Sequence, residues 1–412
     1  MPAKTPSTTS PSPAPERTPA SGQPASGPPG TGGTPGTGGR IAALDVLRGL
    51  AIIGTLASNI WIFTAPGGPA GWISGGMADA EPVQRVLQTL SNGKFLGLLT
   101  LLFGVGLELQ YRSMVRRGLP WPGRYALRAG ILFVEGLVHY VLVFEFDVLM
   151  GYAIASLVAA YLIGRSDRVV RAWGGVLAGL FVVAIAGATA LMVTAGGSGT
   201  ASGEDGGTQA ADPAAFSTAS WFDQVLLRLE YLAVFRIELI LIVPSATVLF
   251  LVGSRLVRAG LFTTTEDGAR LRRRLAWVGL GAGIPLNALT AWAGPDWFLV
   301  DRYVVPPLVA VGILALGTTL VARAKTRPGL LRRGVEGVGR TALSCYVLQN
   351  VLASALCYDW GLGLAGGGPW QAVALWAGIS LALMILAPLW LRRWPRGPIE
   401  LLMHRVYDAR RR

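Results

Sequence analysis

The run LDVLRGLAIIGTLASNIWIFTA at residues 44–65 decides the fold, because its only charged residues are Asp45 and Arg48 near its beginning. A helix needs about 20 predominantly apolar residues to cross the hydrocarbon core of a bilayer. This stretch therefore predicts a membrane-spanning helix. Nine further runs of roughly 17–25 apolar residues follow it. The ten predicted spans cover residues 44–65, 93–112, 125–145, 148–164, 173–195, 232–254, 275–293, 303–322, 340–358 and 370–391.

The composition of the whole chain agrees with a membrane protein. Of its 412 residues, 52% are hydrophobic and only 14% are charged, whereas soluble domains carry about 25% charged residues. The mean hydropathy is +0.49. These values exclude a soluble enzyme and a nucleic-acid-binding domain. The apolar runs lack the alternation typical of strands, and an open sheet cannot exist in lipid. We therefore predict an all-α fold, a polytopic bundle of about ten transmembrane helices.

The net charge of +13 follows from the membrane topology. If the N-terminus is cytoplasmic, 30 of the 36 lysines and arginines fall in cytoplasmic segments, and only Arg85, Arg228 and Arg302 fall in outer loops. This asymmetry is the positive-inside pattern. It predicts that both termini are cytoplasmic and that the basic side faces anionic lipid. The expected location is a bacterial plasma membrane, crossed many times.

The two ends of the chain differ from the apolar middle. Residues 1–39 are rich in Pro, Gly, Ser and Thr, a composition typical of disorder. No apolar segment follows Met1, so we do not expect a signal peptide. The predicted domains are a disordered cytoplasmic tail at 1–39, a transmembrane domain at 40–395 and a basic cytoplasmic tail at 396–412.

Ionisable residues inside spans are the candidates for chemistry, since each costs about 2.5–3.5 kcal/mol on insertion scales. Glu135 and His139 are four residues apart on one helix face, so the carboxylate could orient the imidazole as a general base. A structural histidine is the alternative. Asp45 and Arg48 share a face and can pair, or Arg48 can extend to the headgroups. The other members of the set are Lys94, Glu108, Glu145, Asp147, Arg236 and Glu238.

Four motifs occur in a fixed order along the chain. They are Leu44-Asp45-x-x-Arg48-Gly49; Gly93-Lys94-Phe95 with Leu101-Leu102-Phe103-Gly104-Val105-Gly106; Gly136-Leu137-x-His139 with Asp147-Val148-Leu149 and Tyr152-Ala153; and Gly339-Arg340-Thr341-Ala342-Leu343-x-x-Tyr346-x-x-Gln349. Over roughly residues 40–400 the chain resembles the YeiB-like bacterial membrane proteins. That family is similar to the transmembrane acyltransferase clan of heparan-α-glucosaminide N-acetyltransferase.

The resemblance implies transfer of an acyl group from cytoplasmic acyl-CoA to a lipid or saccharide acceptor at or across the membrane. The expected catalytic residues are then His139, Glu135 and Asp147. Acyl-CoA would be a co-substrate, with no tightly bound cofactor and no metal. Its contacts would come from Asp45, Arg48, Arg340 and Gln349.

A transporter or exporter is the alternative function, because the same buried charges could line a translocation path. A non-catalytic scaffold is a third possibility, and a homodimer is left open. For the acyltransferase we expect a cavity that runs from the cytoplasmic face to His139. Glu135 and His139 should point into this cavity, because lipid exposure would leave both polar groups unpaired.

Overall fold

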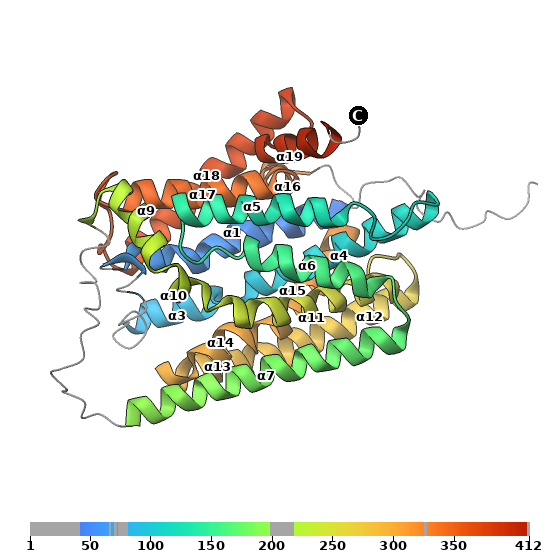
Figure 1. Ribbon diagram of the computed structural model, residues 1–412, viewed down its shortest axis with the longest axis horizontal. Helices are drawn as coiled ribbons and strands as arrows, with labels where there is room; N and C mark the ends of the chain where they lie inside the picture. The colour runs from blue at the N-terminus through green and yellow to red at the C-terminus, as the bar shows by residue number, and fades with distance from the viewer. Residues whose placement is uncertain are drawn as a thin grey trace, which may run out of the picture. The chain divides into compact units, whose positions relative to one another are not determined.

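The computed structural model describes residues 42–65, 67–69, 72, 81–197, 218–324 and 328–409, and every regular element in these ranges is helical (Figure 1). This confirms the all-α fold class. The first half contains α1 (Ala42–Thr64), α3 (Pro82–Ser91), α4 (Lys94–Arg116), α5 (Tyr125–Leu142), α6 (Leu149–Ile163), α7 (Asp167–Gly197), α9 (Trp221–Glu230) and α10 (Leu232–Arg236). The second half contains α11 (Leu239–Arg258), α12 (Glu266–Ala276), η1 (Trp277–Ala282), α13 (Gly283–Trp292), η2 (Pro295–Trp297), α14 (Phe298–Tyr303), α15 (Pro306–Arg323), α16 (Leu330–Arg340), α17 (Ala342–Cys357), α18 (Pro369–Arg393) and α19 (Pro398–Ala409).

Among the described residues, eight helical stretches are long and apolar enough to cross a membrane. Two shorter apolar helices, α6 and α17, coincide with the predicted spans at 148–164 and 340–358. The chain is thus a helical protein of membrane type, while the count of ten spans and the cytoplasmic termini stay predictions. The tight connection between the third and fourth spans comprises residues 143–148, between the end of α5 and the start of α6.

Glycines let the central helices approach closely. Helix α4 packs against α1, α6, α11 and α15. A Cβ atom at Gly104 would lie 2.2 Å from the carbonyl oxygen of Phe250, so α4 and α11 touch backbone to backbone there. In the same way, a Cβ at Gly339 on α16 would lie 1.8 Å from the Asp45 carbonyl oxygen on α1. Small residues at such crossings are typical of helix packing in membranes, which explains why both motifs contain glycine.

The predicted C-terminal tail contains a helix that contacts the bundle. Glu400 on α19 accepts hydrogen bonds from the backbone N–H groups of Leu343 at 2.9 Å and Ser344 at 3.3 Å. These N–H groups lie in the first turn of α17, where a helix has no internal acceptors for them. Glu400 therefore caps α17 and fixes where this helix begins. The predicted N-terminal tail at 1–39 lies outside the described residues.

Candidate functional site

A buried histidine–aspartate pair lies at the junction of α5, α6 and α17. His139 on α5 and Asp147 in the α5–α6 connection are 3% and 1% exposed. The Nδ1 atom of His139 and the Oδ1 atom of Asp147 are 2.9 Å apart, a hydrogen-bonding distance. Ionisable groups buried in this way are expensive unless they are paired. The pair is therefore the most specific polar contact between the α5 and α6 segments.

The side chain of Asp147 accepts hydrogen bonds from three groups besides His139. Its Oδ2 atom accepts hydrogen bonds from the backbone N–H groups of Leu149 at 2.9 Å and Met150 at 3.4 Å, at the positive end of α6. The Tyr346 hydroxyl donates to its Oδ1 atom at 3.3 Å. Since Asp147 only accepts, the proton of the contact with His139 belongs on Nδ1, and the Nε2 lone pair is the acceptor that faces Asn350 Nδ2.

Gly136, from the same motif as His139, makes this arrangement possible. A Cβ atom at Gly136 would lie 2.7 Å from the Met150 nitrogen and 2.9 Å from the Asp147 Oδ2 atom. Any other residue would push α6 and the carboxylate away from α5. The glycine thus serves the approach of Asp147 to the histidine.

Helix α17 supplies amide groups on the other side of the imidazole. The Asn350 Nδ2 atom lies 3.3 Å from His139 Nε2. Neighbouring Gln349 is fully buried, and both of its amide atoms lack a hydrogen-bond partner among the described residues, as does Oδ1 of Asn350. A buried polar atom left without a partner costs about 1–3 kcal/mol. Such atoms next to a histidine indicate a place for water or a polar ligand.

Glu135 does not occupy the place that its spacing predicts. The i, i+4 relation favours Glu135 as the partner of His139, but the structure gives that role to Asp147. Both carboxylate oxygens of Glu135 are buried without a hydrogen-bond partner in the described part of the chain. The spacing places both side chains on one face of α5, but it does not decide which acid the ring meets. Asp147 instead reaches the ring through the turn after α5.

The residues expected to bind acyl-CoA lie in two places. Arg48 and Asp45 pair on α1, with 3.9 Å between Nη1 and Oδ1, as the sequence predicts. Arg340, at the end of α16, is exposed and follows the glycine that packs against Asp45. Gln349 is two turns inside α17 and precedes Asn350, which contacts the histidine. The structure thus separates Gln349 from the cluster at the α1–α16 contact. In the ranges described, no group of three or more His, Cys, Asp or Glu side chains is arranged to hold a metal.

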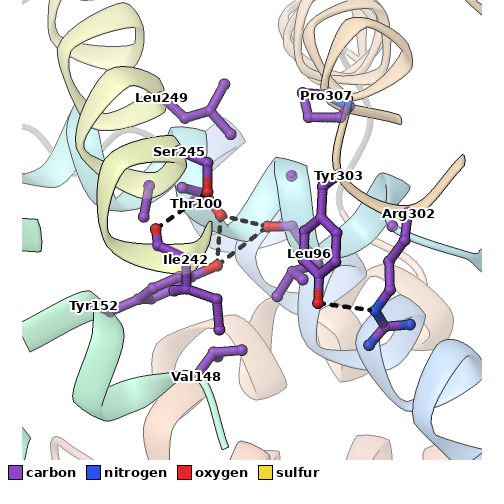
Figure 2. A pocket seen from close by; sticks show the side chains of 13 residues that line it. Leu96, Thr100, Val148, Tyr152, Ile242, Ser245, Leu249, Arg302, Tyr303 and Pro307 are labelled. Atoms are coloured by element: carbon purple, nitrogen blue, oxygen red, sulfur yellow. Dashed lines mark hydrogen bonds between the residues drawn. The ribbon is translucent and has the colours of Figure 1, made fainter. Parts of the chain in front are cut away.

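The larger cavity lies beside the histidine site and does not contain it. About 380 Å³ of empty space separates α4, α6 and α11 from the α14–α15 turn. Figure 2 shows Thr100 and Tyr152 on one side of it and Tyr303 and Arg302 on the other. Neither this cavity nor a smaller one near Trp72 is lined by His139 or Glu135. The cavity from the cytoplasmic face to His139 therefore stays a prediction.

Sequence reasoning missed several residues of this site. Tyr346 and Asn350 are four positions apart on α17, the spacing of one helix face, and both contact the pair. That spacing was a usable signal. Arg228 is 1% exposed and its Nε atom lies 2.6 Å from Glu145 Oε1. Its position in a predicted outer loop gave no sign of burial.

The fold and the site define a polytopic helical protein with a buried histidine–aspartate pair. Residues 256–410 match the family described as "Protein of unknown function (DUF418)". The protein YxaH of Bacillus subtilis (strain 168) is 24% identical over 393 residues, which cover 89% of this chain and 94% of that protein. The protein YeiB of Escherichia coli (strain K12) is 26% identical over 390 residues, covering 89% and 96%. No solved structure matches the chain.

These matches confirm the YeiB-like resemblance that the four motifs predict. The similarity to both relatives covers most of the chain. The relationship to the acyltransferase clan stays a prediction.

Proposed function

We propose that this protein is a membrane-embedded acyltransferase of the bacterial plasma membrane. It would move an acyl group from cytoplasmic acyl-CoA to the hydroxyl or amine of a lipid or saccharide acceptor. The observation that carries the proposal is the buried contact between His139 Nδ1 and Asp147 Oδ1 at 2.9 Å. A carboxylate that holds one imidazole nitrogen leaves the other to act as a general base, which is the chemistry that acyl transfer to a hydroxyl requires.

The reaction uses Nε2 of His139 as the base, which an acceptor reaches by displacing the Asn350 amide. As the acceptor oxygen or nitrogen bonds to the thioester carbonyl carbon, its proton moves to Nε2 of His139. The tetrahedral intermediate then collapses, the C–S bond breaks, and the imidazolium returns the proton to the departing CoA thiolate. Asp147 stabilises the imidazolium without taking its proton. A transient acyl group on Nε2 is the alternative route. The Gln349 amide and the Oδ1 atom of Asn350, which have no partner among the described residues, could bind the reacting groups.

The donor would bind near the predicted cytoplasmic end of the bundle. Arg48 and Arg340 both lie by the α1–α16 contact, and arginine is well suited to bind phosphate groups such as those of CoA. In this proposal Gln349 binds the reacting groups and not the CoA phosphates. Assembly as a homodimer stays open.

The test is acyl transfer by purified protein in proteoliposomes supplied with radiolabelled acyl-CoA and a bacterial lipid and sugar extract. His139→Ala should lower the rate of label transfer by about 10²–10⁴-fold, the usual contribution of a general base. The matched control is His404→Gln, which removes the other, exposed histidine and should leave the rate unchanged. Equal rates for His139→Ala and the unmodified protein would overturn the proposal, as would the absence of transfer from every acyl-CoA offered.

A transporter is the second candidate, and the position of the larger cavity favours it. That cavity is lined by Arg302 and Tyr303, and Tyr303 donates a hydrogen bond to the half-buried Glu238 carboxylate. Charged groups around a space inside a helix bundle are typical of translocation paths. Counterflow of a labelled metabolite or lipid in proteoliposomes without acyl-CoA would support transport and contradict the enzyme.

A further inference from the structure

The short connection 143–148 determines where Asp147 lies. It joins the end of α5 at Leu142 to the start of α6 at Leu149 and contains no regular helix of its own. Its backbone carbonyl groups are buried among helices, so they need donors from elsewhere. Two arginines from the α9–α10 segment, which lies beyond residue 217 in the sequence, donate to three of the six, those of Val143, Glu145 and Asp147.

Arg228 on α9 holds the beginning of the connection. Its Nε atom donates to Glu145 Oε1 at 2.6 Å, and the side chains are 1% and 0% exposed. Its Nη1 and Nη2 atoms donate to the carbonyl oxygens of Val141 and Val143, each at 3.3 Å. The Val143 carbonyl also accepts from Ser354 Oγ on α17 at 3.2 Å. Arg228 thus joins the end of α5 to the acidic turn.

Arg236 at the end of α10 holds the carbonyl groups on either side of Phe146. Its Nη1 atom donates to the Asp147 carbonyl oxygen at 3.1 Å, and its Nη2 atom donates to the Glu145 carbonyl oxygen. The guanidinium lies 4.0 Å from the centre of the Tyr140 ring. The Tyr140 hydroxyl in turn donates to the Arg228 carbonyl oxygen at 2.5 Å. The two arginines and Tyr140 therefore form one connected support around the turn.

We propose that Arg228 and Arg236 are positioning residues that hold the connection 143–148 so that Asp147 reaches Nδ1 of His139. The backbone of Asp147 is held from one side by Arg236, and its carboxylate is left to meet the histidine. By fixing that contact, the arginines also fix which imidazole nitrogen carries the proton. In the proposed acyltransferase this decides whether Nε2 is a base, so the inference deepens that function.

Arginine is suited to this task because its planar guanidinium presents several donors in fixed directions. One Arg236 side chain donates to two carbonyl oxygens two residues apart. Lysine would keep the charge and would lose the fixed pair of donors. If the arginines served only to anchor α9 and α10 at the membrane surface, the state of the His139 ring would not depend on them.

The chain allows a direct measurement, because it contains only two histidines. In a His404→Gln background, His139 is the only histidine, provided that the protein carries no histidine tag. The ring-nitrogen signals of ¹⁵N-labelled His139 in lipid nanodiscs then report which nitrogen is protonated. The variant to compare is Arg236→Gln, with Arg236→Lys as a milder change that keeps the charge.

Arg258 provides the matched control. Like Arg236, it donates to a backbone carbonyl oxygen at one end of α6, that of Ile163 at 3.0 Å. It also lies over a tyrosine ring, 5.6 Å from the centre of Tyr111. It contacts the opposite end of α6 from Asp147. Arg258→Gln therefore removes similar interactions without touching the connection 143–148.

We expect a single Nδ1-protonated form of His139 in the background protein and in Arg258→Gln. Arg236→Gln should lose this single form and show both tautomers, and Arg236→Lys should do so to a smaller extent. An unchanged His139 signal in both Arg236 variants would overturn the proposal. The same change in Arg258→Gln as in Arg236→Gln would also overturn it, since the effect would then be general loosening.

A kinetic measurement separates this inference from the proposed function. If acyl transfer occurs, Arg236→Lys should lower kcat by up to about 10²-fold, the effect of a small misplacement of a catalytic group, and leave KM nearly unchanged. A change in the His139 signal without any acyl transfer by the unmodified protein would support the positioning role and contradict the acyltransferase. Acyl transfer by the unmodified protein, together with an unchanged His139 signal in the Arg236 variants, would support the acyltransferase and contradict the positioning role.

Discussion

Two glutamates inside predicted spans, the buried Glu108 and the half-buried Glu135, differ in their partners. Oε1 of Glu108 accepts from Nε of Arg112 at 2.9 Å and from Nε of Arg258 at 3.0 Å. Its Oε2 atom accepts from Ser254 Oγ at 2.7 Å. Glu135, one turn from His139, has no hydrogen-bond partner for either oxygen within the described residues.

The difference separates a structural polar cluster from a candidate site. The Glu108 cluster satisfies its carboxylate within the protein and joins α4 to α11, so it needs no ligand. Around His139, by contrast, atoms of Glu135, Gln349 and Asn350 stay unpaired. Buried polar atoms are nearly always paired, so a group of exceptions marks a place that is adapted to something other than stability.

The largest expected effect concerns the predicted topology, which labelling of single cysteines tests with an all-or-none result. Asp359→Cys should react with a membrane-impermeant maleimide in whole cells, and Arg270→Cys should react only after permeabilisation. Both positions are exposed, and the natural Cys345 and Cys357 are buried. Labelling of position 270 in intact cells would reverse the topology.

The next largest effect concerns which acid orients the His139 ring. Asp147→Asn should lower acyl transfer by about 10²-fold or more, because the ring loses the carboxylate that orients it. Glu135→Gln should lower the rate less, since Glu135 makes no hydrogen bond to the ring. Rates are measured in proteoliposomes with radiolabelled acyl-CoA. A larger loss for Glu135→Gln would restore Glu135 as the orienting acid.

Substitution of the paired Glu108 should mainly affect stability. Glu108→Leu should lower the free energy of unfolding by about 3 kcal/mol, because two arginines lose their shared acceptor. This value lies at the lower end of the usual cost of removing one partner of a buried ion pair. The side chains of Arg112 and Arg258 are 41% and 30% exposed, so they can hydrogen-bond to water instead. Unfolding in mixed detergent measures the change. A variant as stable as the unmodified protein would show that the cluster contributes nothing.

The smallest expected effect is a gain in stability. Glu135→Gln removes a buried, unpaired carboxylate, so we expect the free energy of unfolding to rise by about 1 kcal/mol. The same detergent titration applies, with Glu108→Gln as the matched control, which should lose stability. If Glu135→Gln also loses stability, the Glu135 carboxylate has a stabilising partner and the contrast between the two glutamates fails.

The apolar runs and the arginines were sufficient to predict the fold class. A backbone segment of about 20 residues in lipid must satisfy its own hydrogen bonds, and few structures other than helices do so. The motifs also located His139, Asp147 and Gly136, which do meet in the structure. The partner of His139 was assigned wrongly, since spacing along one helix does not include a residue that returns through a turn. Arg228 was placed in an outer loop because its burial depends on α9 covering the end of α5.

The sequence by itself therefore determined what depends on one segment at a time: which stretches are apolar, which side is basic, and which few ionisable residues lie in the apolar runs. The tertiary structure decided which of these residues meet. Helix α5 alone presents Glu135 and His139 on one face, and only the packing of α6, α9, α10 and α17 around it chooses Asp147 as the partner. The physical reason is that hydrogen bonding between buried groups depends on distances of about 3 Å. Such distances between segments far apart in the chain are fixed by packing and not by spacing along the sequence.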